Sequence, residues 1–119
     1  MAILHLEDDL MLTEIFAEAI EALDESISIV HFAKGTDVLD YMENPTETIS
    51  VCFFDIRVRG TVDGLEVAKQ LREKGFDKPI FMSSAYEKPE SNVMESLNLG
   101  WIPKPWQITD LAKQILPLA

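Results

Sequence analysis

Short apolar runs alternate with amphipathic stretches along the whole chain. Runs rich in β-branched and aromatic residues are typical of strands, and five occur, at residues 2–6, 26–32, 49–54, 79–82 and 101–102. The stretches after them repeat apolar residues at helical spacing, which predicts helices at residues 10–23, 35–43, 65–74, 89–97 and 108–116. This alternation predicts an α/β fold, a doubly wound five-stranded parallel sheet flanked by five helices.

The ends of these elements carry their own signals. Asn44-Pro45 ends the second helix, Gly75 offers a left-handed cap after the third, and Pro117 stops the last. Ile49–Phe54 is nearly continuous apolar, as expected of a central strand covered on both faces. No linker, repeat or low-complexity tract interrupts the pattern, so residues 1–119 are interpreted as a single domain.

The charge balance narrows the range of partners. Lys and Arg number 10 and Asp and Glu number 21, which gives a net charge of −11 with neutral histidines. Such an acidic protein repels phosphate backbones and anionic lipid, so we expect no direct contact with nucleic acid or membrane. No apolar run approaches the ~20 residues of a membrane span. Cys52 has no second cysteine to pair with, which fits a reducing compartment and favours a cytoplasmic protein.

Polar side chains follow four of the five predicted strands. They are Glu7, Asp8 and Asp9 after the first strand, Asp55 after the third, Ser83 and Ser84 after the fourth, and Lys104 after the fifth. Ligands of open α/β sheets bind at the carboxyl ends of the strands. Nucleotide-binding relatives of this architecture place a glycine-rich phosphate loop after the first strand, where this chain has carboxylates. These hard oxygen ligands predict a divalent metal site, for Mg²⁺ with Mn²⁺ as the alternative.

A count of charges supports the prediction of a metal site and indicates that Asp55 acts as a nucleophile. Glu7, Asp8 and Asp55 bring about −3, while Lys104 and one Mg²⁺ bring about +3. Beside that metal an ionised Asp55 is a competent nucleophile towards phosphorus, and Lys104 would neutralise charge on the transferring oxygens. Asp9 is assigned to capping the first helix.

Four motifs then match one family. The run Ile3–Asp9, the strand end Phe53-Phe54-Asp55, Ser84-Ala85 and Lys104-Pro105 occur in this order, each at the end of its expected strand. Together they resemble the receiver domain of two-component response regulators, and the resemblance covers essentially the whole chain. It implies a flavodoxin-like fold.

The resemblance implies a role for each residue of the acidic site. Asp55 would accept a phosphoryl group from a phosphohistidine on a sensor histidine kinase or a histidine phosphotransfer protein. Asp8 would bind Mg²⁺ directly, Glu7 through water, and the backbone carbonyl of Arg57 would complete the protein ligands.

The resemblance also implies a switch. Ser84 and Lys104 would re-pair around the acyl phosphate on Asp55, and Trp101 stands where a smaller aromatic residue swings inward. The phosphorylated form would then change its affinity for a downstream protein. Such a chain is a phosphoacceptor signalling domain that assists its own phosphotransfer and dephosphorylation, and not an enzyme. The Lys104–Pro105 bond is often cis in this family.

The loop after Asp55 departs from the family pattern. Residues 56–64 lack the usual proline and contain one residue more. This leaves open a degenerate receiver that binds partners without phosphorylation. A metal-dependent phosphohydrolase of the haloacid dehalogenase type is a further alternative, but it needs an aspartate where Arg57 stands. No effector follows Leu118-Ala119, so output is expected through surface contacts unless the domain is excised from a larger regulator.

Other side chains have structural interpretations. His5 lies within an apolar strand and is expected to be a hydrogen-bonded structural histidine, whereas His31 is expected to be exposed near a strand end. Cys52 is expected in the core, and Trp106 is expected to pack at the start of the last helix. The structural alternative for Ser83 and Ser84 is that both are turn residues, and the register with Ala85 favours Ser84 as the functional one. A solvated face of the first helix is formed by Glu14, Glu18, Glu21 and Glu25.

Overall fold

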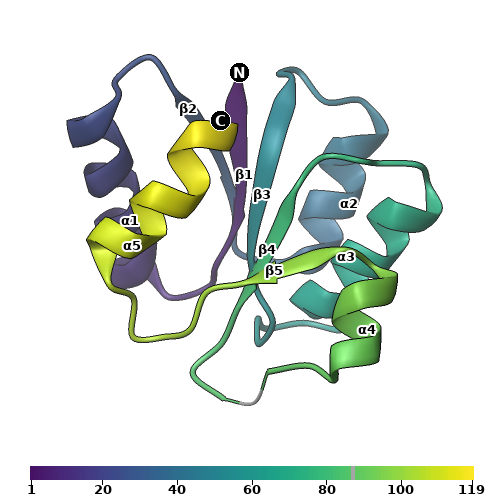
Figure 1. The fold of residues 1–119 in the computed structure, drawn as a ribbon. Coiled ribbons are helices and arrows are strands. Elements are labelled where there is room, and N and C mark those ends of the chain that lie inside the picture. Colours follow the sequence, from purple (N-terminus) through teal and green to yellow (C-terminus); the bar gives the residue numbers. More distant parts are fainter. Residues whose placement is uncertain (87) are drawn as a thin grey trace.

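The computed structural model describes residues 1–86 and 88–119. In this part of the chain one sheet of five parallel strands has the order β2-β1-β3-β4-β5 (Figure 1). The strands are β1 (Ala2–Leu6), β2 (Ser28–Phe32), β3 (Ile49–Asp55), β4 (Ile80–Ser83) and β5 (Leu99–Trp101). The helices are α1 (Leu10–Leu23), α2 (Gly35–Glu43), α3 (Gly64–Glu73), α4 (Ser91–Ser96) and α5 (Ile108–Ile115), with a short 3-10 turn at Leu116–Leu118. The predicted flavodoxin-like α/β fold is confirmed.

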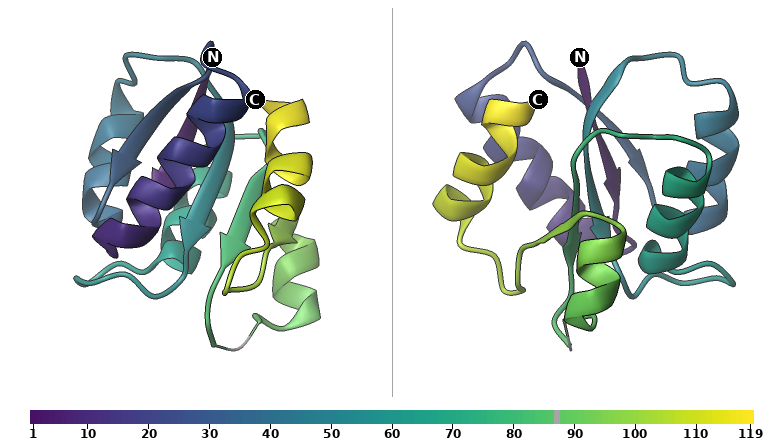
Figure 2. Two further views of the ribbon diagram at one scale, coloured as in Figure 1. Left: turned by 90° about the vertical axis from the view of Figure 1, so that its left-hand side faces the viewer. Right: turned by 45° about the vertical axis from the view of Figure 1, so that its right-hand side comes forward.

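The helices cover both faces of the sheet. Figure 2 shows α1 and α5 side by side on one face and α2 and α3 together on the other, with α4 next to β5. The central strands β1 and β3 are buried along their whole length, and alternate residues face opposite layers. Leu4 and Phe54 contribute to the core under α2 and α3, while Ile3 and Phe53 contribute to the core under α1 and α5.

The last strand lies earlier than the sequence predicts. It covers Leu99–Trp101 instead of residues 101–102, and α4 is shorter than expected. Asn98 explains the difference, because its φ of 53° turns the chain sharply after α4 and starts β5 at the next residue. Asparagine tolerates this left-handed conformation better than most residues.

Two aspartates cap the helices that begin beside the carboxyl ends of the strands. Asp9 accepts hydrogen bonds from the backbone amides of Met11 and Leu12 at the start of α1, so the predicted capping role is confirmed. Asp63 caps α3 in the same way. Gly64 follows it, and a Cβ atom there would overlap the backbone carbonyl of Asp55. A glycine therefore lets α3 begin directly against the end of β3.

The chain ends lie away from this edge. Both termini lie at the opposite end of the sheet, where β1 begins (Figure 1). Among the described residues, no helix combines the length and the apolar character that crossing a bilayer would require.

Candidate functional site

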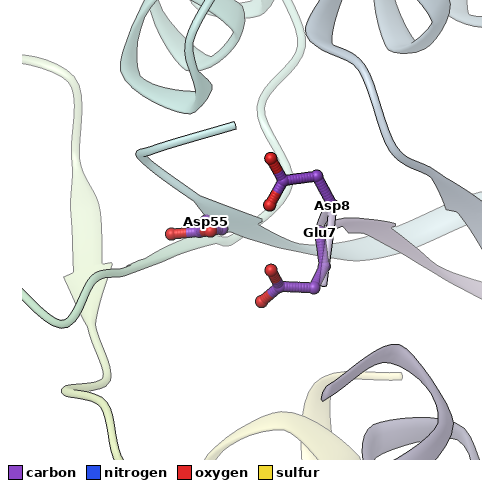
Figure 3. A group of neighbouring side chains, drawn as sticks. All are labelled: Glu7, Asp8 and Asp55. Atoms are coloured by element: carbon purple, nitrogen blue, oxygen red, sulfur yellow. The ribbon is translucent and has the colours of Figure 1, made fainter. Parts of the chain in front are cut away.

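Three carboxylates meet where β1 and β3 end. Glu7 and Asp8 directly follow β1, and Asp55 is the last residue of β3. One oxygen from each lies within 4.8 Å of the others, and Figure 3 shows the three side chains gathered at the strand ends. Glu7 and Asp55 are buried, with 1% and 6% of their surfaces exposed, and Asp8 is half-buried. The pairing of β1 with β3, which sets Leu6 beside Phe54, brings these distant positions together.

Lys104 supplies a positive charge to two of these carboxylates. Its Nζ atom lies 2.8 Å from Oε1 of Glu7 and 3.2 Å from Oδ2 of Asp55, and only 12% of its side chain is exposed. The bond from Lys104 to Pro105 is cis. The sequence analysis predicts an ion pair of Lys104 with Asp55 alone. The ion pair with Glu7 is seen only in the tertiary structure.

The site carries more negative than positive charge. Three carboxylates face the ammonium of Lys104, so −3 and +1 leave about −2 when all groups are ionised and the exposed guanidinium of Arg59 is not counted. Burial raises the pKa of Glu7, and the carboxylate of Asp55 raises it further, against the opposing effect of Lys104. Burial disfavours the charged form of Lys104, but its ion pairs with Glu7 and Asp55 outweigh this and raise its pKa. Oxygen ligands with a surplus of two charges fit a hard divalent cation such as Mg²⁺.

Ser83 is the last residue of β4 and Ser84 follows it, and the two hydroxyls have different partners. Ser84 is buried, and its Oγ accepts a hydrogen bond from the backbone amide of Tyr86. Ser83 is fully buried within β4, and its Oγ accepts a hydrogen bond of 3.0 Å from Nε1 of Trp106. The interpretation of Ser83 as a turn residue is therefore wrong. Its place in the buried strand, opposite Asp55, makes it a partner for the indole.

The loop between β3 and α3 contacts the site with two backbone amides. The amide of Arg57 donates to Oδ1 of Asp55 at 3.3 Å, and its guanidinium lies over the ring of Tyr86, 4.4 Å from the ring centre. The amide of Arg59 donates to Oδ2 of Asp8 at 2.9 Å, and Nε of Arg59 lies 3.8 Å from the same oxygen. Sequence reasoning missed Arg59. A basic residue in a lengthened loop between acidic positions was the available signal.

The two tryptophans lie on opposite layers. Trp101 ends β5 next to Met82 and packs, half-buried, against the core under α2 and α3. Trp106 precedes α5 and packs against the rings of Phe16 and Phe53 in the other core, close to Lys104. The ring centre of Trp106 lies 5.7 Å from Nζ of Lys104, so this tryptophan is next to the charged groups.

The two histidines have different outcomes. His5 is a buried structural residue, as expected, and stacks on Phe53, but among the described residues its Nδ1 has no hydrogen-bond partner. Burial lowers its pKa to about 3. His31 is half-buried instead of exposed, because its Nε2 lies 2.8 Å from the carbonyl oxygen of Glu7 and 3.2 Å from Oγ1 of Thr13. A carbonyl oxygen only accepts hydrogen bonds, so Nε2 of His31 carries the hydrogen and donates it. This hydrogen bond joins the backbone of Glu7 to β2.

Cys52 lies in the core, as the sequence predicts. It is fully buried in β3, and burial raises the pKa of its thiol beyond the physiological range. Cys52 therefore takes no part in the chemistry of the site.

Comparison with known proteins identifies the family. The response regulator receiver domain model matches residues 3–116. The response regulator RppA of Synechocystis is 30% identical over 87 residues, which cover 71% of this chain and 36% of that protein. The response regulatory domain of mrkE from Klebsiella pneumoniae has a TM-score of 0.84 at 22% identity, covering 99% of this chain and 94% of that chain. TrrA from Thermotoga maritima, solved with Mg²⁺-BeF, has a TM-score of 0.80 at 24% identity, covering 99% and 98%. With its acidic cluster beside a lysine at the strand ends, this chain belongs to the response regulator receiver domains.

Proposed function

We propose that this receiver domain accepts a phosphoryl group on Asp55 in a Mg²⁺-dependent reaction and thereby changes its affinity for a protein partner. The observation that carries the proposal is the position of Asp55, whose carboxylate lies 3.2 Å from Lys104 and within 4.8 Å of oxygens of Glu7 and Asp8. Receiver domains are signalling domains that interact with histidine kinases or phosphotransfer proteins. A phosphohistidine on such a protein is the proposed donor, and the cytoplasm the proposed location.

The chemistry is a displacement at phosphorus. A carboxylate oxygen of Asp55 forms the new P–O bond while the P–N bond to the donor imidazole breaks. The donor ring carries a proton on its other nitrogen, so the imidazole takes the electron pair of the P–N bond and leaves as a neutral ring. Lys104 would stabilise the charge on the transferring oxygens, and the 3.2 Å distance from its ammonium to Asp55 supports this role.

The proposed metal ligands are the carboxylates of Asp8 and Asp55, Glu7 through water, and the backbone carbonyl of Arg57. The donor set fits Mg²⁺, with Mn²⁺ as the alternative, since all ligands are oxygens and the site has a surplus of about two negative charges. A bound Mg²⁺ would supply positive charge to the phosphoryl oxygens. The Mg²⁺-BeF complex of the structurally similar Thermotoga protein supports this assignment.

The proposed switch uses Ser84 and Trp101. The Oγ of Ser84 acts as an acceptor for the amide of Tyr86, and its hydroxyl group can also donate its hydrogen to a phosphoryl oxygen on Asp55. Trp101, in β5, would respond to that movement. The phosphoryl group can shift the balance between two conformations only by the difference in its interactions with them.

Intact mass measurement tests the acceptor. The protein is incubated with Mg²⁺ and a small phosphodonor, and a single base-labile phosphoryl adduct is expected, absent when EDTA replaces Mg²⁺. The Asp55→Asn variant removes the nucleophile and keeps the shape, so it should stay unmodified. An adduct on Asp55→Asn, or none on the wild type, would contradict the proposal and favour an interaction module that works without phosphorylation.

A further inference from the structure

Arg59 contacts Asp8 from the loop between β3 and α3. Its backbone amide donates to Oδ2 of Asp8 at 2.9 Å, and its Nε lies 3.8 Å from the same oxygen. These two residues are 51 positions apart in the chain. A side-chain charge and a backbone donor from one residue therefore converge on one carboxylate oxygen.

Asp8 is the accessible member of the acidic site. Its side chain is 20% exposed, against 1% for Glu7 and 7% for Asp55, and among the described residues the carboxylates that Lys104 contacts are these two buried ones. Positive charge is therefore divided between two residues. Lys104 forms ion pairs with the buried carboxylates, and Arg59 forms one with Asp8, the carboxylate that solvent reaches most easily.

We propose that Arg59 is a built-in counter-charge that competes with the divalent cation for Asp8 and weakens its binding. This inference rests on the proposed metal site and concerns the regulation of that site. The guanidinium charge lies close to the carboxylate that would bind the metal. It therefore repels an incoming cation and partly neutralises the negative charge of Asp8. Movement of the guanidinium away from Asp8 would therefore favour the binding of a divalent ion.

The contact is weak enough to be displaced. The side chain of Arg59 is 87% exposed and its ion pair is long, so it contributes little to folding. The following residue, Gly60, has a φ of 107°, a conformation that glycine adopts without strain, at the tip of this irregular loop. Arg59 can therefore swing into solvent while its backbone amide keeps Asp8 in place.

The Arg59→Gln variant isolates the charge. It leaves the amide hydrogen bond to Asp8 intact and removes only the guanidinium. We expect Mg²⁺ to bind about three- to tenfold more tightly at low salt, the range expected for one unit charge several ångströms from a divalent ion near the surface. Arg59→Lys keeps the charge and should bind Mg²⁺ within about twofold of the wild type. Titrations are followed by amide NMR shifts of residues 56–63 and by the emission of Trp106, which lies close to Lys104.

Lys113→Gln is the matched control. Lys113 is exposed in the last turn of α5, at the end of the sheet away from the acidic site, and its loss changes the net charge equally. Its Mg²⁺ affinity should match that of the wild type. The advantage of Arg59→Gln should shrink as ionic strength rises, because salt screens the exposed guanidinium.

The outcomes separate the two proposals. Equal or weaker Mg²⁺ binding by Arg59→Gln, beside a wild type that binds and an Asp8→Asn variant that does not, would overturn the role of Arg59 and leave the metal site standing. Failure of the wild type to bind Mg²⁺ at all would overturn both. Tighter binding by Lys113→Gln, equal to that of Arg59→Gln, would show an effect of net charge and also overturn the inference.

Discussion

The Nζ atom of Lys104 lies 2.8 Å from Oε1 of Glu7, nearer than to the carboxylate of Asp55. Glu7 is almost fully buried, so its charge depends on this ammonium for compensation. One lysine therefore has two tasks, because it stabilises a buried carboxylate and also faces the proposed acceptor. Variants of Lys104 are expected to show both.

The Lys104→Gln variant should lower the free energy of unfolding by about 2–3 kcal/mol at pH 7 in EDTA, because two buried carboxylates lose their cation. Mg²⁺ should restore part of the loss, since it binds the folded state. The folded-state pKa of Glu7 is already raised, so Glu7 favours folding at low pH and loses that contribution as pH rises. Urea unfolding should therefore show a larger deficit at pH 8 than at pH 5. A deficit that is independent of both pH and Mg²⁺ would contradict this account.

Adjacent serines should give opposite phenotypes. Ser83→Ala leaves the indole Nε1–H of Trp106 without its acceptor and should lower the free energy of unfolding by about 1 kcal/mol, with little effect on phosphorylation. Ser84→Ala removes the acceptor of the Tyr86 amide, beside an exposed side chain where water can replace it, so the loss should be no more than about 1 kcal/mol. It should accept a phosphoryl group but fail to change tryptophan emission afterwards. Chemical unfolding and intact mass measure the pair, and a normal emission change in Ser84→Ala would exclude its proposed role as a switch.

Arg72 joins α3 to the segment that leads into β5. Its guanidinium donates hydrogen bonds of 2.7–3.1 Å to the backbone carbonyls of Phe76, Lys78, Leu97 and Asn98. Arg72→Met keeps most of the aliphatic length and leaves these carbonyls without their donor. We expect a loss of about 2–3 kcal/mol in the free energy of unfolding and faster amide exchange in residues 97–101.

Lys74→Met is the control for Arg72→Met. Lys74 forms an exposed ion pair with Glu43, so its loss should cost less than about 1 kcal/mol and leave amide exchange in β5 unchanged. Equal effects of the two variants would mean that the hydrogen bonds of Arg72 contribute no more than a surface charge.

His5 should make the protein sensitive to mild acid. Its pKa is about 3 in the folded state against an ordinary value of 6.5, so between these values the unfolded chain binds a proton that the folded chain does not. Stability is therefore lost as pH falls below 6.5. From pH 7 to pH 5 the contribution of His5 amounts to about 2 kcal/mol.

His5→Leu removes this titration and keeps the position apolar. Urea unfolding in EDTA should then show a free energy of unfolding that falls less between pH 7 and pH 5 than in the wild type. The raised pKa of Glu7 acts in the opposite direction in both proteins, so it largely cancels from the comparison. Identical pH profiles would show that His5 is not buried in its neutral form.

The order of strands and helices was predictable because hydrophobic periodicity reports which face of each element is buried. The carboxyl ends of parallel strands share one edge, so the positions of Asp8, Asp55 and Lys104 were predictable as neighbours from strand boundaries alone. Asp9 was predictable as a cap because capping is a contact between residues two or three apart. Each of these predictions depends on local sequence or on a general rule of parallel sheets.

The sequence by itself determined the fold class, the order of the strands along the chain and the chemical character of the edge where their carboxyl ends meet. Only the tertiary structure decided that Lys104 pairs with Glu7, that Ser83 meets Trp106 and that Arg59 reaches Asp8. Those contacts depend on the path of loops and on packing between layers. Ser83 and Trp106 are 23 positions apart in the chain, and Asp8 and Arg59 are 51 positions apart. Local hydrophobic periodicity cannot predict contacts between residues so far apart in the sequence, because it reports which positions are buried and not which residues contact them.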